Sequence, residues 1–533
     1  MIDKLSASRG VAVLLCVVCL LSGCGKNIAY GYEETASWKN NVHELISDTE
    51  TVQTVDENRT WYEVFVYSFY DSDGDGIGDI NGITQMLDYI SYMGFDGIWL
   101  MPIHPSPTYH KYDVTDYYAI DPAYGTIEDF DRFMEACDER GIAVMMDFVI
   151  NHTSSEHDWF IQAKEALAAG EEDNPYVSYY HFSKMKGNGR WEKATGEWYY
   201  ECQFWSGMPD LNLDNPELKK ELEKVMEFWL NKGVSGLRLD AVREYETGNQ
   251  DKNMEIMRWV NETAKSIRPD TYVVGEAWDT SIALYQLYDS GLDSFFNFPF
   301  AMAEGKLAKS LLLKSQKASD YADALVVMEE EIHAHNPNGV DAPFFTNHDT
   351  ARAVGIMRQQ PELIKTAWGM NLMQAGNVFV YYGEEIGMSG SGIDENKRQP
   401  MRWTDGRSEG TPYPPPNSES VEHKFPPLNE QIQDDQSILQ YVRSAIHIRK
   451  KYPEIAGGRA SVLAIEGGDK VSLLMRTLGE EKVYLVYNLG SETEQISLDL
   501  EAEICDGLYT AQEEAVYNEG MLTLPPYSIV IMR

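Results

Sequence analysis

Three acidic residues stand at or just beyond the ends of short apolar runs. Asp240 and Glu276 each end such a run, and Asp349 follows a third run closely. One acid in this position is often a helix N-cap, but three behind apolar runs are hard to explain as caps. If they converge, a carboxylate about 5–5.5 Å from a carboxylic acid can attack the anomeric carbon of a sugar while the acid protonates the leaving oxygen. The three residues therefore predict the chemistry of glycoside hydrolysis.

Basic residues accompany these acids. Arg238 precedes Asp240 by two positions, so both side chains would lie on one face of a strand, where the guanidinium keeps the carboxylate ionised and oriented. His152 and His348 also stand at the ends of apolar runs. Burial and like charges would raise the pKa of one carboxyl group in this pocket, which makes that group usable as an acid near neutral pH.

Eight short apolar runs, most of them separated by helical stretches, would position these residues. Each run is continuous rather than alternating, as expected for strands buried on both faces of a parallel sheet. Eight βα units predict an α/β fold, a (β/α)8 TIM barrel, whose active site gathers at the carboxyl ends of the strands. A doubly wound sheet is the alternative, but such sheets seldom reach eight units. The runs are Tyr62–Tyr70, Gly97–Pro102, Ala143–Ile150, Val234–Asp240, Tyr272–Glu276, Leu292–Phe298, Ala342–Thr346 and Val378–Tyr382.

Two segments depart from the barrel pattern. Residues 152–208, after the third predicted strand, are rich in aromatic side chains and predict an inserted subdomain, domain B, beside the active site. These aromatics can stack on sugar rings or form a small core of the insertion. Residues 456–533 alternate apolar and polar positions and predict a C-terminal antiparallel β-sandwich, domain C. The catalytic barrel, domain A, would then comprise residues 59–151 and 209–455.

The N-terminal residues have the features of a targeting signal. Two basic residues precede an apolar run that ends at Leu21 and is too short to span a bilayer as a mature helix. The run continues into Ser-Gly-Cys24, which resembles the bacterial lipoprotein processing box; an ordinary secretory signal is the alternative. We expect a signal peptide at residues 1–23, lipidation of Cys24, and a lipidated tether at residues 24–58. This predicts a protein that is lipid-anchored at the cell surface or on the periplasmic side of a bacterial membrane.

Composition limits the possible partners. The 533 residues include 44 basic and 85 acidic ones, a formal net charge of −41, which excludes nucleic acid because a polyanion would be repelled. The hydrophobic fraction of 43% excludes wholesale disorder. Three of the six cysteines lie in the first 24 residues, and the other three are too scattered for a disulfide framework, so we expect them to be buried. We expect a monomer with a neutral polysaccharide as substrate.

Four segments resemble the four core motifs of the α-amylase family, glycoside hydrolase family 13, and the resemblance covers nearly all of residues 60–533. The four are Asp147–His152, Gly236–Asp240, Val274–Trp278 and Phe345–Asp349. The resemblance implies that Asp240 is the nucleophile, Glu276 the general acid/base and Asp349 the residue that holds the distorted sugar. It also implies five further substrate-binding residues. Tyr112 would be a stacking platform and Asp147 a support residue. The contacts to the sugar would be His152, Arg238 and His348.

A fifth motif, Met208–Asn212, bears on specificity. It mixes features of oligo-1,6-glucosidases and neopullulanases, and it is similar to an intermediate group of bacterial α-amylases, several of them lipoproteins. Ala241 stands where α-1,6-acting relatives typically have Val, and Tyr109 stands where pocket-type α-glucosidases usually have Asp. The resemblance implies retaining, endo-type hydrolysis of α-1,4-glucosidic bonds in starch, maltodextrins or related α-glucans through a covalent glycosyl-enzyme intermediate.

Other activities of the same family remain alternatives. An α-glucosidase, an oligo-1,6-glucosidase or a neopullulanase-like enzyme would use the same fold and the same three acids. Transglycosylation shares the covalent intermediate and also stays open. A catalytically inactive glucan-binding protein is disfavoured, because such relatives usually lose at least one of the three acids.

An acidic loop between Asp71 and Asp79 predicts a cation site. Oxygen ligands on alternate residues, with glycines that let the backbone curl, suit a hard cation such as Ca²⁺. The loop resembles the calcium loop that follows the first strand in many family members, but it differs from an EF-hand because Gly82 replaces the twelfth-residue Glu. A solvated acidic turn is the alternative. The expected ligands of a structural Ca²⁺ are Asp71, Asp73, Asp75, Ile77 through its carbonyl oxygen, and Asp79.

A second calcium site of the family is not expected. It normally uses the asparagine that matches Asn151 and a histidine four residues after the nucleophile. Glu244 occupies that later position, so Asn151 is not predicted to be a metal ligand.

Overall fold

The computed structural model describes residues 58–533, and its centre is a parallel β-barrel. Seven strands pair side by side in the order β10-β1-β2-β3-β7-β8-β9. The segment after β9 closes the ring, because Ala342 bridges Phe296 in parallel and Phe344 bridges Phe379. The predicted TIM barrel is therefore confirmed. Its strands are β1 (Thr60–Val64), β2 (Gly97–Leu100), β3 (Ala143–Phe148), β7 (Gly236–Leu239), β8 (Tyr272–Gly275), β9 (Ser294–Phe295) and β10 (Val378–Tyr381).

The barrel strands are buried almost throughout, which explains their continuous apolar runs. Side chains that point inward near the amino ends of the strands fill the barrel with a separate aromatic core. Trp99 stacks on Phe296 at 5.2 Å, and Trp61 stacks on Phe379 at 6.0 Å between ring centroids. A packed interior leaves the carboxyl ends of the strands as the place for a site.

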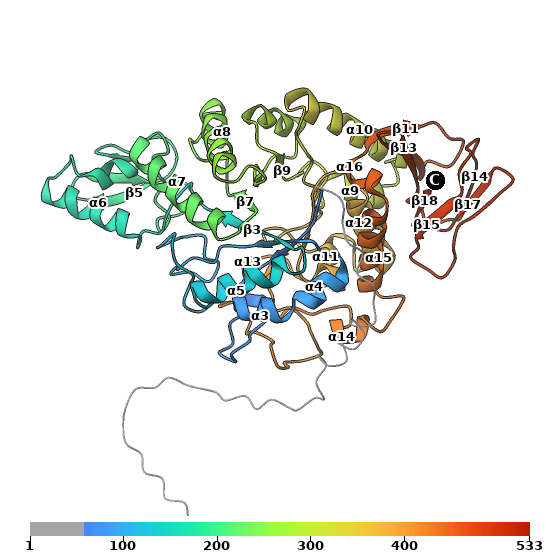
Figure 1. Ribbon diagram of the computed structural model, residues 1–533, viewed down its shortest axis with the longest axis horizontal. Coiled ribbons are helices and arrows are strands. Elements are labelled where there is room, and N and C mark those ends of the chain that lie inside the picture. Colours follow the sequence, from blue (N-terminus) through green and yellow to red (C-terminus); the bar gives the residue numbers. More distant parts are fainter. Residues whose placement is uncertain (1–57) are drawn as a thin grey trace, which may run out of the picture.

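Helices surround the barrel (Figure 1). Sequence signals set several of their ends: a Thr126–Asp129 capping box starts α5, and Asn215 followed by Pro216 starts α7. The longer helices are α4 (Leu87–Met93), α5 (Ile127–Asp138), α7 (Pro216–Asn231), α8 (Gln250–Ile267), α9 (Lys306–Leu312), α10 (Ala318–His335), α12 (Pro361–Leu372) and α15 (Ile438–Lys451). The shorter ones are α2 (Val66–Phe69), α3 (Ile80–Gln85), η2 (Ile282–Ser290), α11 (Ala353–Ile356), η3 (Glu384–Ile386), α13 (Asp394–Lys397), α14 (Leu428–Gln431) and α16 (Pro453–Gly457).

Three predicted strands are shorter than expected, and one of them, Ala342–Thr346, forms only the isolated bridges that close the ring. The run Tyr62–Tyr70 is strand only to Val64, because its second half forms the short helix α2. The run Leu292–Phe298 contributes only the two residues of β9. A short apolar run that is buried on all sides has no periodicity to separate strand from helix, and the prediction was wrong there for that reason.

The segment between β3 and α7 forms a small inserted unit. It contains α6 (Asp158–Ala169), η1 (Pro175–Tyr179) and an antiparallel sheet of β4 (Phe182–Ser183), β6 (Trp198–Glu201) and β5 (Trp191–Thr195). Phe160 of α6 packs against Tyr180 at 5.0 Å and Tyr200 at 4.9 Å between ring centroids. Many of the aromatics of this segment thus form its own core, whereas Phe204 and Trp205 are exposed.

Residues after α16 form two antiparallel sheets with an apolar core between them. In Figure 1 they lie at the opposite end of the molecule from the inserted unit. A buried ion pair between Arg476 and Glu329 of α10 ties them to the barrel. One sheet contains β11 (Arg459–Leu463), β12 (Val471–Leu478), β13 (Glu481–Asn488), β18 (Ser528–Met532) and β15 (Ile504–Leu508), and the other β14 (Glu494–Ser497), β17 (Met521–Leu524) and β16 (Val516–Asn518).

The N-terminal predictions lie outside the described residues. These are the signal peptide at residues 1–23, the lipidated Cys24 and all but the last residue of the tether. Among residues 58–533, no helix is both long and apolar enough to cross a membrane. Of the three scattered cysteines, Cys137 and Cys202 are buried as expected, but Cys505 is exposed on the short strand β15.

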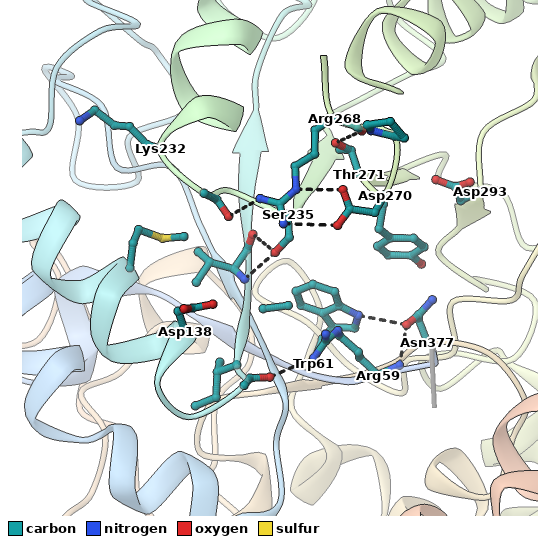
Figure 2. A pocket seen from close by; sticks show the side chains of 18 of the residues that line it. Arg59, Trp61, Asp138, Lys232, Ser235, Arg268, Asp270, Thr271, Asp293 and Asn377 are labelled. Carbon is teal, nitrogen blue, oxygen red and sulfur yellow. Dashed lines mark hydrogen bonds and ion pairs between the residues drawn. The ribbon is translucent and has the colours of Figure 1, made fainter. Parts of the chain in front are cut away.

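A broad cavity of about 1260 Å³ lies at the amino ends of the barrel strands (Figure 2). Four basic side chains line it, and each is held by an acid or by a backbone carbonyl. The contacts are Lys232–Asp131 at 2.8 Å, Lys265–Asp293 at 2.7 Å, Arg268–Asp270 at 3.0 Å, and Arg59 to the carbonyl oxygen of Asp96 at 2.8 Å. All four cations are therefore engaged in holding strands and helices together, and the chemistry belongs to the opposite end of the barrel.

Candidate active site

The predicted site residues gather at the carboxyl ends of the barrel strands. Arg238 lies within β7, Asp240 directly follows that strand, and Glu276 directly follows β8. Asp147 and His152 lie in and just after β3, and Tyr112 lies in the connection between β2 and α5. His348 and Asp349 lie in the segment that closes the barrel. Contacts among them show that the structure brings them together, although more than 230 residues separate Tyr112 from His348 in sequence.

Arg238 lies within 4 Å of three acids of the site. Its side chain is fully buried, and its Nη1 lies 2.6 Å from Asp240 Oδ1 and 2.7 Å from Asp147 Oδ1. Its Nη2 lies 3.6 Å from Glu276 Oε2. The two acids that follow the adjacent strands β7 and β8 thus face one guanidinium, which brings together the pair of carboxyl groups that a glycosidase needs.

Glu276 is suited to carry a proton at neutral pH. Burial raises the pKa of its carboxyl group to about 7, helped by the charges of Asp240 and Asp349 and opposed by Arg238 and by the backbone N–H of Ala241. That N–H donates to Glu276 Oε2 at 3.0 Å. Ala241 has a φ of 47°, a left-handed conformation that costs energy in a residue with a Cβ. The turn directly after Asp240 therefore orients the second acid.

Asp349 lies in the opposite electrostatic environment. Burial disfavours its charge, but His348 and Arg398 outweigh burial and hold the pKa of Asp349 well below its usual range. Arg398 Nη2 lies 2.8 Å from Asp349 Oδ1, and His348 Nε2 lies 3.1 Å from Oδ2. One pocket therefore holds an acid that is protonated near neutrality and another that stays ionised, which is the division of roles that glycoside hydrolysis requires.

Asp147 and Tyr112 support the other groups. Asp147 Oδ2 accepts from Tyr112 Oη at 3.1 Å and from Trp99 Nε1 at 3.3 Å, while its other oxygen meets Arg238. The ring of Tyr112 stacks on His348 with centroids 5.7 Å apart. The Tyr112 hydroxyl group is therefore held by hydrogen bonds, while its ring forms part of the wall of the active site.

His152 lies on the side of the inserted unit. It is buried, its backbone pairs with that of Asp210 in an isolated antiparallel β-bridge, and its ring lies 5.2 Å from that of the exposed Phe204. Burial lowers the pKa of His152, so this side chain is a neutral hydrogen-bonding group. Its Nε2 has no hydrogen-bond partner among the described residues, which leaves that atom for a ligand.

Sequence reasoning missed two charged residues of the site. Glu63 of β1 is buried, and its Oε1 lies 2.5 Å from His348 Nδ1. Arg398, just after α13, contacts Asp349 and also Tyr109 Oη at 3.3 Å. An acid inside the apolar run of the first strand was a signal that could have found Glu63, but nothing in the irregular loop around Arg398 marks it.

A pocket of about 540 Å³ opens beside Glu276. It is lined by aromatic side chains from two loops, Phe204 of the insertion and Trp278 just after Glu276. Phe204 is 45% exposed and Trp278 is 49% exposed, both unusually high values for large apolar side chains. Flat apolar rings at the mouth of a carboxylate site offer surfaces on which sugar rings can stack.

The acidic loop between α2 and α3 brings three of its aspartates together. Carboxylate oxygens of Asp71, Asp73 and Asp79 all lie within 4.8 Å of one another, whereas Asp75 does not join this group. Asp75 Oδ1 accepts the backbone N–H of Ile77 at 2.7 Å, just as Asp71 accepts those of Gly74 and Gly76. Three converging carboxylates fit a hard divalent cation, so the residues present suit Ca²⁺, with Asp75 in a supporting position.

Asn151 lies in a second polar cluster. Its Nδ2 donates to Asp210 Oδ1 at 3.3 Å. Burial, together with the charges of Glu201 and Glu244, raises the pKa of Asp210 to about 7. The neighbouring acids thus favour a protonated Asp210 that is held by hydrogen bonds.

Comparison with known proteins agrees with this geometry. The α-amylase catalytic-domain family model matches residues 63–458. α-Amylase 3 of Dictyoglomus thermophilum is 37% identical over 483 residues, which cover 90% of this chain and 93% of that protein. An oligo-1,6-glucosidase of Heyndrickxia coagulans is 28% identical, with 81% and 91% covered. The solved structure of Eubacterium rectale Amy13B has a TM-score of 0.87 and 41% identity, covering 92% of this chain and 98% of that one. The chain therefore belongs to the α-amylase family, glycoside hydrolase family 13, and is a glycoside hydrolase.

Proposed function

We propose that this enzyme is an α-amylase that cleaves internal α-1,4-glucosidic bonds of starch, maltodextrins or related α-glucans with retention of configuration. The observation that carries the proposal is the pair of acids around Arg238: Asp240 is held at 2.6 Å from the guanidinium, and Glu276 has its pKa raised to about 7. This pair supports the roles of Asp240 as the nucleophile and Glu276 as the proton donor.

The first step forms a covalent intermediate. A carboxylate oxygen of Asp240 attacks the anomeric carbon, the bond from that carbon to the glycosidic oxygen breaks, and Glu276 gives its proton to the departing oxygen. Asp349 remains ionised between His348 and Arg398 and can accept hydrogen bonds from the hydroxyl groups of the distorted sugar. Burial strengthens each of these interactions because the local dielectric is low.

The second step releases the sugar. Glu276, now a carboxylate, removes a proton from a water molecule that attacks the same carbon from the side of the departed group, and the bond to Asp240 breaks. Two inversions give net retention. Glu276 finishes the cycle protonated and Asp240 ionised, so the enzyme is regenerated.

Two observations support chain cleavage at α-1,4 bonds. The pocket beside Glu276, with Phe204 and Trp278 in its lining, offers room for further glucose units of a chain. In addition, the relative α-amylase 3 shares 37% identity over most of both chains, against 28% for the oligo-1,6-glucosidase.

One contact favours a second candidate, an α-glucosidase or oligo-1,6-glucosidase. Arg398 bridges Asp349 and Tyr109, at 2.8 Å and 3.3 Å. This bridge joins two loops beside the sugar site and would narrow it at the non-reducing end, as an enzyme that removes single glucose units requires.

A substrate panel separates these candidates. With maltoheptaose reduced at its end, starch, pullulan and isomaltose as substrates, we expect mixed maltooligosaccharides from the first two and slow or no cleavage of isomaltose. Glucose as the sole product from the non-reducing end would establish the α-glucosidase instead. Rapid cleavage of isomaltose would establish the 1,6-acting enzyme.

We further propose a structural Ca²⁺ held by Asp71, Asp73 and Asp79, and a lipid anchor at Cys24. The convergence of the three carboxylates supports the first, and the N-terminal sequence pattern supports the second. The anchor would hold domains A, B and C, with the boundaries expected above, at the outer face of a bacterial membrane. The enzyme would act there as a monomer on a polysaccharide that cannot enter the cell.

A further inference from the structure

Glu63 is an acid in an unexpected place. It lies in the middle of β1, only 1% exposed, between the fully buried Tyr62 and Val64. A buried carboxylate is costly unless a charged partner and hydrogen bonds offset the loss of water. Its partner is His348, whose Nδ1 lies 2.5 Å from Glu63 Oε1 and whose side chain is fully buried.

The other nitrogen of His348 also faces oxygen atoms. His348 Nε2 lies 2.8 Å from Tyr112 Oη and 3.1 Å from Asp349 Oδ2. The Tyr112 hydroxyl has one hydrogen, which it can donate to Asp147 Oδ2, 3.1 Å away, or to His348 Nε2. Each neutral tautomer of His348 turns one lone pair toward a carboxylate, either Nδ1 toward Glu63 or Nε2 toward Asp349. Only an imidazolium presents an N–H donor to both carboxylates.

Charged groups surround His348 from every neighbouring element. The acids are Glu63 on β1, Asp147 on β3 and Asp349 next in the chain, and the cations are Arg238 on β7 and Lys397 and Arg398 after the barrel. Tyr112 and Tyr381 pack on the ring, and burial keeps both phenols neutral by raising their pKa values. Burial alone lowers the pKa of His348, but Asp349 and Glu63 overcome it and raise the pKa to about 9.

We propose that Glu63 is a positioning residue that holds His348 as an imidazolium cation, with one N–H fixed on Glu63 and the other facing Asp349 and the Tyr112 oxygen. This inference rests on the proposed function of the site. Glu63 does not reach the reacting atoms. It acts through His348, which keeps Asp349 ionised and oriented.

The sign of the pH effect follows from the raised pKa of His348. The cation is present at acid and neutral pH and is lost as pH rises through about 9. Without the charge of Glu63, His348 would lose its proton at a lower pH, within the working range of the enzyme. Asp349 would then lose one of its two cationic partners.

The test compares Glu63→Gln with a matched control, Glu385→Gln. Glu385 is another fully buried acid, in the short helix η3, and it accepts from Tyr62 Oη at 2.6 Å and from Tyr89 Oη at 2.9 Å without contacting His348. Both substitutions keep the side-chain shape and remove one buried charge. Only Glu63→Gln should change His348.

The direct readout is NMR titration of isotope-labelled histidines, with the His348 signal assigned by its absence in His348→Asn. We expect the titration midpoint of His348 to fall by about one pH unit or more in Glu63→Gln, a tenfold loss of proton affinity, and to stay in place in Glu385→Gln. Glu63→Asp, which keeps the charge, should restore part of the shift. This titration needs no substrate, so it stands or fails independently of the proposed glucan specificity.

Kinetics gives the second readout. The ratio of wild-type to Glu63→Gln kcat/KM should grow by about twofold or more between pH 5.5 and pH 8, as a His348 midpoint lowered by one unit or more requires, and the ratio for Glu385→Gln should stay constant. An unchanged His348 midpoint in folded Glu63→Gln would overturn the proposal. If that variant does not fold, the wild type decides: a His348 that is neutral at pH 7 overturns the proposal as well.

Discussion

At the scale of single residues, one buried arginine organises the acids of the site. Arg238 contacts Asp147, Asp240 and Glu276, and none of its own surface reaches solvent. Removing one partner of a buried ion pair typically costs about 3–5 kcal/mol, because the other charge is left without compensation. Substitution of Arg238 would therefore combine loss of stability with loss of activity. The informative substitutions are those that keep the shape of each acid.

Asp240→Asn and Glu276→Gln should separate the two catalytic roles. We expect Asp240→Asn to lose about 10³-fold or more of kcat on every substrate, because no nucleophile remains. Glu276→Gln should lose a similar factor on starch but much less in the first step on an α-maltosyl fluoride, since fluoride leaves without a proton. Burst kinetics with added azide measures that step. Equal losses of Glu276→Gln on starch and on the fluoride would contradict the acid role.

The pH profile should report Glu276. Its pKa is raised to about 7, so the protonated form that can act as an acid is present below that pH and is lost as pH rises through it. We expect kcat/KM on a maltooligosaccharide to fall about tenfold per pH unit above pH 7. A profile that stays flat to pH 9 would show that another group donates the proton.

The sequence could predict the acids of the site but not all of their partners. Asp240 and Glu276 were predictable because the ends of neighbouring parallel strands meet at one rim of the barrel. Glu63 and His348, in contrast, are 285 residues apart, and only the closed ring places the first strand beside the segment that carries His348. Arg398 comes from a loop with no local pattern, so its contact with Asp349 needed the structure.

At the scale of secondary structure elements, the eight apolar runs predicted the barrel, but they did not predict how much of each run forms a strand. The seventh run forms only single bridges through Ala342 and Phe344. The first run turns into α2 after Val64 because buried apolar residues suit strand and helix equally. That early helix matters for function, since it ends just before the acidic loop and sets where its carboxylates converge.

The acidic loop predicts a contrast between two neighbouring aspartates. Both Asp73 and Asp75 are exposed, but only Asp73 belongs to the convergent group. With Ca²⁺ at a hundred times its Kd, binding should stabilise the fold by about 2.7 kcal/mol. We expect Asp73→Asn to abolish the calcium-dependent rise in Tm and Asp75→Asn to keep most of it. Differential scanning calorimetry with and without a chelator measures both variants, and equal behaviour would return Asp75 to the ligand set.

At the scale of the whole molecule, the first described residues and the active site lie at opposite ends of the barrel. Residues 58 and 59 line the cavity at the amino ends of the strands, whereas the acids lie at the carboxyl ends. A tether that precedes residue 58 would therefore join the barrel on the face away from the active site. Such an arrangement leaves the site and its exposed aromatics open to a large polysaccharide.

The anchor prediction is tested at Cys24. Expression of Cys24→Ala in a bacterial host should move the enzyme from the detergent phase to the aqueous phase in a phase-separation assay, because one cysteine carries the whole lipid. Specific activity on soluble starch should change less than about twofold. Incorporation of labelled fatty acid into the wild type but not into Cys24→Ala is the control, and equal partitioning of the two would contradict the anchor.

The most direct test of retaining endo-hydrolysis is the first product seen by proton NMR during cleavage of maltoheptaose. We expect α-anomers of several maltooligosaccharides to appear first, before mutarotation produces β-anomers, since Asp240 and Glu276 act in two inverting steps. Initial β-anomers would contradict the covalent mechanism, and glucose alone would contradict internal cleavage.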